Sequence, residues 1–364
     1  MQFTIQREAL FKPLQRVAGA IERRQTRPIL ANVLVVVKNQ LLSLTGTDLE
    51  VEMVARIPLS QSAQSGAIAI SGKKLIDICK ALPEQALISF TLMENKVLVC
   101  SKRSRYSIAC LPAENFPKVE ESVGDIELSI PQSVFRQLLE LVCFAMAQQD
   151  VRYYLNGVLM VFSPGEVRMV AADGHRLATM ALPIHTHLTA QHAVIVPRKA
   201  VSELQRLLAE GEEEIGLVIG KHHLRAVMTH SSFITKLIEG KFPDYQRVLP
   251  ASGGHEVILP REQLRQALLR VSALFTDKYK GVGLQFSPHL LRIIAVTQDK
   301  DEVEDEIEIP YEGPALEIGA NASYLIEYLN IVKADQVKIT FTSPDHALLF
   351  EETTHAYVVM PMRL

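Results

Sequence analysis

The sequence has few cysteines, and their spacing fits no metal or disulfide pattern. The 364 residues include four cysteines, Cys79, Cys100, Cys110 and Cys143, and no two of them form a Cys-x-x-Cys pair. Zinc sites and disulfide frameworks depend on closer or more regular spacing. We therefore interpret the four cysteines as buried thiols that pack like small apolar side chains.

The sequence also lacks a long apolar run. Its densest apolar stretch covers residues 33–37, which is the length of a strand. A membrane-spanning helix needs about 20 such residues in succession. The first residues, 1–7, do not show the charged and then apolar order of a signal peptide. We expect no membrane association, and the expected compartment is the cytoplasm.

Charge of one sign is not in excess over the whole chain. The formal net charge is −3 at pH 7, which by itself argues against a nucleic-acid partner. The distribution is uneven, however. Basic residues outnumber acidic ones in residues 1–125, the two kinds balance in 126–253, and acidic residues predominate in 254–364. The two ends of the chain are therefore oppositely charged.

What the sequence does contain is a repeat. Its three copies lie at residues 3–17, 128–142 and 257–271. Each copy has a short alternating segment, a polar turn and then apolar residues at the i, i+3, i+4 and i+7 spacing of a helix face. Ile5, Ile130 and Leu259 occupy matching positions. Each copy is therefore predicted to begin with a strand followed by a helix.

Two further segments recur in the same order. Alternating, strand-like segments occur at residues 42–48, 167–173 and 291–296, and second helices are predicted at 73–82, 198–208 and 323–332. A copy of about 120 residues is long enough to build its own core. The predicted fold is α+β, with three tandem domains at residues 1–125, 126–253 and 254–364.

Basic residues recur on the predicted helices of every copy. They are Lys12, Arg16, Lys73, Lys74, Lys80, Arg198, Lys199, Arg206, Arg265 and Arg270. If the helices of the copies share one side of the molecule, that side attracts phosphates without reading bases. The alternative is an ordinary solvated helix face.

Two segments of opposite charge suggest how copies of the chain associate. Residues 102–108 form a predicted basic strand, and residues 299–306 form an acidic run. Complementary charge favours head-to-tail pairing of the first repeat of one chain with the third repeat of another. Such a contact either closes into a ring or propagates as a filament. Two chains would give six domains without a free sheet edge.

Seven motifs, in order along the whole chain, resemble the family of bacterial DNA polymerase III beta subunits, the beta sliding clamps. The motifs lie at residues 27–30, 44–50, 149–157, 173–178, 242–245, 247–250 and 357–364. The resemblance implies three DNA-clamp domains per chain and a homodimeric ring of six domains. Sheets would form the outside of the ring, and helices would line a hole that holds duplex DNA.

The resemblance also implies a function and partners. It implies a processivity subunit without catalytic site, cofactor or metal, which tethers polymerases to DNA. The implied partners are double-stranded DNA bound independently of sequence, a clamp loader, the DNA polymerase III alpha subunit and other polymerases, and mismatch-repair and ligase-type proteins.

Three sets of site residues follow from matching positions. The DNA-contacting residues are expected to be Arg24, Lys73, Gln149, Tyr153, Tyr154, Arg198 and Lys199. A pocket for a partner peptide, expected between the second and third domains, would be lined by Arg152, Leu155, Gly174, His175, Arg176, Leu177, Pro243, Arg247, Val248, Asn321, Tyr324, Val358, Val359, Met360, Pro361, Met362 and Arg363. The dimer interface would contain Arg103, Arg105, Tyr106, Ile108, Ala273, Leu274, Asp301, Glu302, Glu304 and Asp305.

Three positions depart from the family pattern. Ala172 stands where the pocket commonly has a small hydroxyl residue, and residues 343–347 match too poorly to assign to the pocket. Ala273-Leu274 replaces a bulkier apolar pair at the expected dimer edge. The lost apolar area predicts a looser ring, since burial contributes roughly 25 cal/mol per Å².

Two other functions compete with the clamp. A hydrolase could use Asp173 and His175, although no paired nucleophile accompanies them, and the histidines at 185, 187, 192, 222 and 223 could suggest a metal site without a firm ligand pattern. A free-standing DNA-binding regulator would read bases, but no helix-turn-helix is evident. The sequence favours the clamp.

Overall fold

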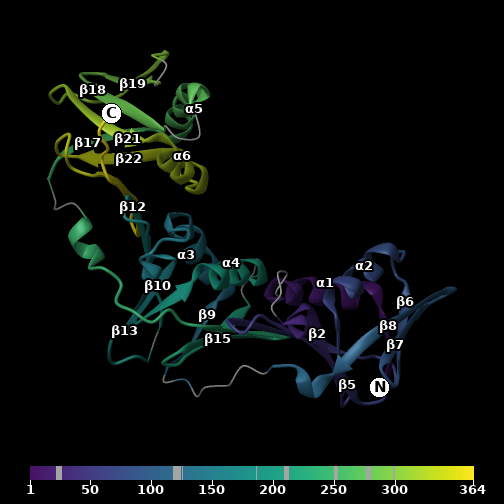
Figure 1. Cartoon of the computed structure of the whole chain (residues 1–364). Coiled ribbons are helices and arrows are strands. Elements are labelled where there is room, and N and C mark those ends of the chain that lie inside the picture. The colour runs from purple at the N-terminus through teal and green to yellow at the C-terminus, as the bar shows by residue number, and fades with distance from the viewer. Residues whose placement is uncertain are drawn as a thin grey trace. The chain divides into compact units, whose positions relative to one another are not determined.

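The computed structural model describes residues 1–21, 27–117, 124, 126–185, 187–208, 213–249, 253–275, 280–297 and 300–364. The described chain forms two compact units, residues 1–133 with 202–237 and residues 134–201 with 238–364. Figure 1 shows the elements of both. Arg24, an expected DNA contact, lies outside the described residues.

The first unit is built on one antiparallel sheet. Its strands are β1 (Gln2–Gln6), β2 (Asn32–Lys38), β3 (Leu41–Thr47), β4 (Val51–Pro58), β5 (Gly66–Ser71), β6 (Leu87–Met93), β7 (Lys96–Ser101), β8 (Ser104–Pro112), β9 (Ile126–Pro131), β14 (Glu214–Ile219), β15 (His223–Met228) and β16 (Ser231–Lys236). Their order is β1-β6-β7-β8-β5-β2-β3-β4-β16-β15-β14-β9. Helices α1 (Arg7–Val17) and α2 (Gly72–Ala81) contact each other and strands β2 to β5.

The second unit contains two antiparallel sheets. Its strands are β10 (Gly157–Ser163), β11 (Glu166–Ala172), β12 (Arg176–Pro183), β13 (His192–Pro197), β17 (His255–Pro260), β18 (Gly281–Ser287), β19 (Leu290–Val296), β20 (Glu302–Glu308), β21 (Leu316–Asn321), β22 (Gln336–Phe341), β23 (Leu348–Glu351) and β24 (His355–Val359). One sheet has the order β13-β10-β11-β12-β24-β23-β22-β17, and the other β20-β19-β18-β21. Helices α5 (Arg261–Val271) and α6 (Ala322–Ile331) belong to this unit.

The repeat predicted from the sequence is present in the structure. Strands β1, β9 and β17 each lead directly into a helix, namely α1, α3 (Gln132–Glu140) and α5. The matching residues Ile5, Ile130 and Leu259 are all buried. The second helices are α2, α4 (Arg198–Leu207) and α6, each directly after a strand. The three tandem copies of a mixed helix and sheet domain are thus confirmed.

Neighbouring copies are joined by strand pairing. Strand β4 of the first copy pairs with β16 of the second, and β12 of the second pairs with β24 of the third. The expectation that each copy builds a separate core is therefore incomplete, because two sheets continue across the expected boundaries. Backbone hydrogen bonding at a sheet edge accepts any extended partner, so a repeat pattern alone does not reveal it.

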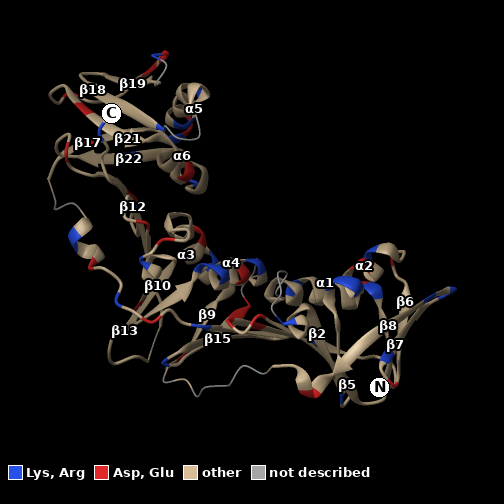
Figure 2. Cartoon of the chain, in the orientation of Figure 1, with Lys and Arg blue, Asp and Glu red and all other residues tan. Residues whose placement is uncertain are grey.

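Exposed basic side chains lie on the helices of the first unit. Lys12 and Arg16 are exposed on α1, and Lys73, Lys74 and Lys80 are exposed on α2. Figure 2 shows the blue segments of both helices. The buried sides of these helices carry apolar residues, so the basic residues occupy the opposite side. This placement agrees with the predicted basic helix face.

The cysteine prediction holds for one residue. Cys79 is buried in α2, and burial raises the pKa of its thiol to about 11. Cys100, Cys110 and Cys143 are only partly buried. The prediction of four buried thiols is therefore wrong for these three, because residues at strand and helix margins keep one side toward solvent.

Candidate functional sites

The second unit brings the segment after Asp173 next to the end of the chain. Strands β12 and β24 pair antiparallel, with Leu177 opposite Val358. The ladder is extended by the Met360 amide, which donates to the His175 carbonyl oxygen at 2.8 Å. The Met362 amide donates to the Gly319 carbonyl oxygen at 2.9 Å. These bonds fix the C-terminal residues along the edge of the expected pocket.

An apolar cluster lies on one face of this sheet. It consists of Ala147, Leu155, Leu159, Val161, Val170, Ala172, Leu177, Ile195, Phe242, Leu349 and Val358, and Tyr154, Ile238, Tyr245, Leu249, Ala347 and Ala356 pack against it. Three of the expected pocket residues, Leu155, Leu177 and Val358, are buried members. They form the floor of the candidate site.

The other expected pocket residues differ in how far they are exposed to solvent. Those exposed to solvent are Arg152, Gly174, His175, Pro243, Arg247, Val248, Met360 and Arg363, and those half-buried are Asn321, Tyr324, Pro361 and Met362. Val359 is buried but is not part of the cluster, because it alternates with Val358 along β24. The sequence predicts Val359 as a pocket residue. In the structure its side chain lies on the opposite face of the sheet from Val358.

Several members of the cluster were missed from the sequence. Leu349, Leu249 and Ala347 pack in it, and Ala347 belongs to the segment 343–347 that matched the family poorly. The alternation of residues 347, 349 and 351 along an extended segment is the signal that could have placed Leu349 and Ala347 on one face.

Arg176 is held inside the protein. Its guanidinium donates to Asp173 Oδ2 at 3.0 Å, to Glu327 Oε2 at 2.6 Å and to the Phe144 carbonyl oxygen at 2.9 Å. Its Cζ lies 4.3 Å from the ring centroid of Tyr324. The side chain is only 8% exposed. Because these contacts hold it on several sides, Arg176 orders the wall of the site.

Asp173 organises the turn that leads into β12. Its Oδ1 accepts hydrogen bonds from the backbone amides of His175 (2.9 Å) and Arg176 (3.0 Å). This is the turn geometry that an aspartate followed by glycine favours. The carboxylate thus serves the turn through the backbone amides of His175 and Arg176.

A second loop is tied to this turn by Arg152. The Arg152 guanidinium donates to both oxygens of Asp150, at 3.0 and 2.9 Å, and to the Asp173 carbonyl oxygen at 3.1 Å. The hydrogen bonds from Arg152 lower the pKa of the Asp150 carboxyl to about 2. Gly174 has a φ of +92°, and a Cβ there would lie 2.7 Å from Arg152 Nη2. Only glycine fits this backbone and this neighbour without strain.

The expected DNA-contacting residues differ in their availability. Lys73 is exposed in the first unit. In the second unit Gln149 is exposed at a φ of +54°, and Tyr153 is 57% exposed with its ring packed edge-on against half-buried Tyr154. Lys199 is half-buried.

Arg198 is less available than expected. Its Nη1 donates to the Met146 carbonyl oxygen at 3.0 Å and lies 3.4 Å from that of Ala147. These hydrogen bonds from Arg198 stabilise the loop that precedes η5 (Tyr153–Leu155). Arg198 therefore ties α4 to the loop that contains Met146 and Ala147.

The expected interface residues lie on two strand edges. Strand β8 pairs with β7 through Ser104–Ala109 and with β5 only through Cys110–Pro112, so in the described chain the other edge of Ser104–Ala109 is unpaired. Strand β20 is the last strand of its sheet. Within the third copy Arg270 forms an ion pair with Asp305.

Some interface predictions need correction in detail. Lys102 and Arg103 lie in the turn between β7 and β8, so the basic strand starts at Ser104. Ile108 is already buried in the single chain. Ala273 and Leu274 are exposed in η7 (Ser272–Leu274), and Tyr106 is half-buried. Asp299 lies outside the described residues.

Neither a metal-ligand group nor a membrane-spanning helix is found among the described residues. No three histidine, cysteine, aspartate or glutamate side chains in that part of the chain are grouped as metal ligands would be. Among the described helices, none is long and apolar enough to cross a membrane.

Comparison with known proteins identifies the family. Residues 1–120, 129–244 and 246–363 match the models of the N-terminal, central and C-terminal domains of the DNA polymerase III beta subunit. The chain is 50% identical to the beta sliding clamp of Pseudomonas aeruginosa and 43% identical to that of Escherichia coli K12, with full coverage of both chains in each case.

Solved structures agree. The crystal structure of the DNA polymerase III beta subunit from Pseudomonas aeruginosa superposes with a TM-score of 0.97 at 50% identity, and each chain is covered completely. A second crystal structure of that protein, bound to griselimycin, gives the same values. The chain thus belongs to the DNA polymerase III beta subunit family, the beta sliding clamps, whose members are processivity factors without catalytic activity of their own.

Proposed function

We propose that the chain closes as a homodimeric ring around duplex DNA and confers processivity on the replicative polymerase. Membership of the sliding-clamp family supports this function directly. The observation that carries the docking part of the proposal is the apolar cluster beside the ordered C-terminal residues 360–363. A clamp needs such a site, because a ring without affinity for a polymerase cannot tether it.

The candidate pocket suits a short, partly apolar peptide. Leu155, Leu177 and Val358 supply an apolar floor, and the exposed Met360 adds an adaptable side chain at the rim. Arg247 is exposed and forms a surface ion pair with Asp244 at 2.9 Å, a contact that a ligand carboxylate can replace at little cost. The bound griselimycin in the Pseudomonas aeruginosa relative supports a ligand site on this fold.

Contact with DNA would be electrostatic and independent of sequence. The exposed lysines and arginine of α1 and α2 can pair with phosphates, a contact that carries no information about the bases. Gln149 and the exposed ring of Tyr153 would contact the backbone or unpaired bases.

Dimer closure would pair the unpaired edge of β8 with β20 of a second copy. The first edge carries Arg105, next to Arg103 in the turn, and the second carries Glu302 and Glu304. Opposite charges favour this head-to-tail pairing over pairing of like edges. Two such contacts close the ring and cover both edges.

The remaining partners follow from this role. They are a clamp loader that opens the ring, the DNA polymerase III alpha subunit and other polymerases, and mismatch-repair and ligase-type proteins that dock at the same pocket. The compartment is the cytoplasm, where bacterial replication takes place.

Retention on DNA of defined topology tests the ring. The protein is loaded on nicked circular DNA by a clamp loader and passed through a sizing column in moderate salt, and the run is repeated after the circle is cut. Retention on the circle and loss from the linear DNA is the expected result, because a closed ring leaves DNA only at an end. Equal retention on both would show ordinary electrostatic binding and would favour the DNA-binding regulator.

A further inference from the structure

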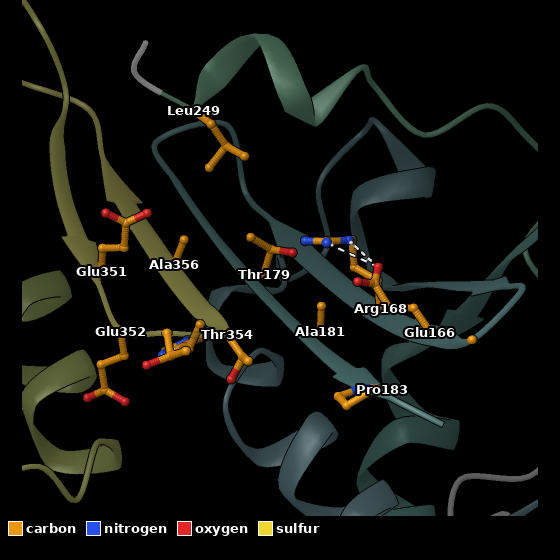
Figure 3. A pocket seen from close by; sticks show the side chains of 13 residues that line it. Glu166, Arg168, Thr179, Ala181, Pro183, Leu249, Glu351, Glu352, Thr354 and Ala356 are labelled. Carbon is orange, nitrogen blue, oxygen red and sulfur yellow. Dashed lines mark hydrogen bonds and ion pairs between the residues drawn. The ribbon is translucent and has the colours of Figure 1, made fainter. Parts of the chain in front are cut away.

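A second pocket lies on the same sheet face as the apolar cluster. It is lined by Gly165, Glu166, Arg168, Thr179, Ala181, Pro183, Leu249 and residues 351–356, and we name it the Thr179 pocket (Figure 3). No residue of this pocket was assigned a role from the sequence.

Strand register places the Thr179 pocket in line with the cluster. Leu177 lies opposite Val358, and Thr179 lies opposite Ala356. Residues two apart on a strand share a face, so Thr179 continues the row that begins with the cluster member Leu177. Leu249 and Ala356 line the pocket and also pack against the cluster. The Thr179 pocket and the cluster therefore lie next to each other on one sheet face and share Leu249 and Ala356.

The chemistry of the Thr179 pocket differs from that of the cluster. Thr179 is 2% exposed, and its Oγ1 has no hydrogen-bond partner among the described residues. Figure 3 shows this side chain between Ala356 and Arg168. A hydroxyl that is buried without a partner is rare in folded proteins, and it retains an acceptor position for a donor.

Charge on the lining favours a cation. Arg168 is already bonded to Glu166, with Nε 3.2 Å from Oε1. Glu351 is exposed, and it lies opposite Ala356, which in turn lies opposite Thr179, so the three residues share one sheet face. The lining carries the three carboxylates of Glu166, Glu351 and Glu352 and the one guanidinium of Arg168. Lys338 interacts with Glu351 from outside the lining, but its ammonium is also paired with Glu256 at 2.7 Å. The pocket is therefore negatively charged. A lysine or arginine side chain offers donors to both Glu351 and Thr179 Oγ1.

We propose that the Thr179 pocket is a second subsite of the peptide groove, which holds a lysine or arginine side chain flanking the apolar anchor residues of a partner. This inference rests on the proposed docking function. It adds a site for a basic side chain to a pocket whose floor is apolar and whose rim carries the basic residue Arg247.

The test uses labelled synthetic peptides and the full chain. Each peptide has an apolar core of leucine and phenylalanine, and alanine at the flanking positions is replaced one position at a time by lysine. Affinities are measured by fluorescence anisotropy for the wild type and for the variants Thr179→Val and Glu351→Gln. Glu84→Gln, at an exposed glutamate of the first unit, is the control with the same change in net charge.

We expect lysine at one flanking position to tighten binding about 5-fold, as for a single charge-assisted contact at a partly exposed site. Both pocket variants should remove this gain and leave the alanine-flanked peptide unaffected, and Glu84→Gln should change nothing. If the core peptide binds but no flanking lysine increases its affinity, the subsite is overturned and the docking function stands. The same holds if the increase persists in both pocket variants. Failure of the core peptide to bind at all would overturn the docking function and the subsite with it.

Discussion

At the scale of single residues, the peptide site depends on side chains that order its wall. Asp173 and Arg152 hold the turn around Gly174, and Arg176 ties that turn to Phe144 and Glu327. These hydrogen bonds hold the turn beside the exposed residues of the pocket rim.

Gly174→Ala should destabilise the protein and weaken peptide binding. The positive φ costs about 1 kcal/mol for alanine, and the new Cβ would also displace the Arg152 guanidinium. Gly165→Ala is the matched control, since Gly165 has a φ of +81° and a Cβ there would meet no atom within 4 Å. Thermal unfolding and core-peptide affinity should show a larger loss for Gly174→Ala. Equal losses would mean that the Arg152 contact is unimportant.

Arg176→Lys should lower the free energy of unfolding by about 2–3 kcal/mol, although the charge is kept. Lysine cannot form the three hydrogen bonds of the planar guanidinium at this buried position. Arg292→Lys, which removes an exposed guanidinium paired with Glu306, should change it by less than about 0.5 kcal/mol. Urea unfolding of the two variants compares them, and similar midpoints would show that the Arg176 network contributes little.

His355 should make the protein less stable in mild acid. Burial lowers the pKa of its imidazole to about 4, partly offset by the hydrogen bond of Nε2 to the Leu141 carbonyl oxygen. Between about pH 6.5 and pH 4 the unfolded chain binds a proton that the folded chain does not, so this stability is lost as the pH falls. The loss between pH 7 and pH 5 is about 2 kcal/mol.

The measurement for His355 is the urea midpoint at pH 7 and pH 5 for the wild type and His355→Gln. Glutamine does not titrate, so the variant should be less stable at pH 7 but should lose about 2 kcal/mol less on acidification. An unchanged pH dependence would show that His355 is not the titrating group.

At the scale of elements, the edges of β8 and β20 should determine association. Reversing Arg103 and Arg105 to glutamate should shift the dimer toward monomer, because like charges then face each other. Adding Glu302→Lys and Glu304→Lys in the same chain should restore part of the dimer. Sedimentation velocity at low salt measures the dimer fraction of both variants. If the added lysines at 302 and 304 restore no dimer, this pairing of edges is excluded.

At the scale of the whole molecule, the ring should open more readily than one with bulkier apolar residues at the edge. Ala273 and Leu274 are exposed, and Ala273 offers little apolar area for burial in a dimer. Ala273→Ile should stabilise the dimer by about 1–2 kcal/mol, roughly a tenfold tightening. Analytical ultracentrifugation should detect monomer of the wild type at nanomolar concentration, and a complete absence of monomer there would refute the looser ring.

The sequence by itself determined the three copies, their strand-then-helix order and the basic helix faces. These features are local and periodic, so Ile5, Ile130 and Leu259 reveal them without any knowledge of distant contacts. The family motifs also pointed to Leu155, Leu177 and Val358 as pocket residues, and the structure places all three in one cluster.

Only the tertiary structure decided how the copies share sheets and which site residues are free. The pairing of β12 with β24 joins segments far apart in the chain, and Arg176 reaches both Phe144 and Glu327. The Thr179 pocket arises from the same long-range pairing. Such contacts join segments that are far apart in the chain, and a hydrophobic period does not predict which segments pair. An edge strand can pair with many extended segments, and a charged side chain can bind many partners, so only the packing of the folded chain determines the pair.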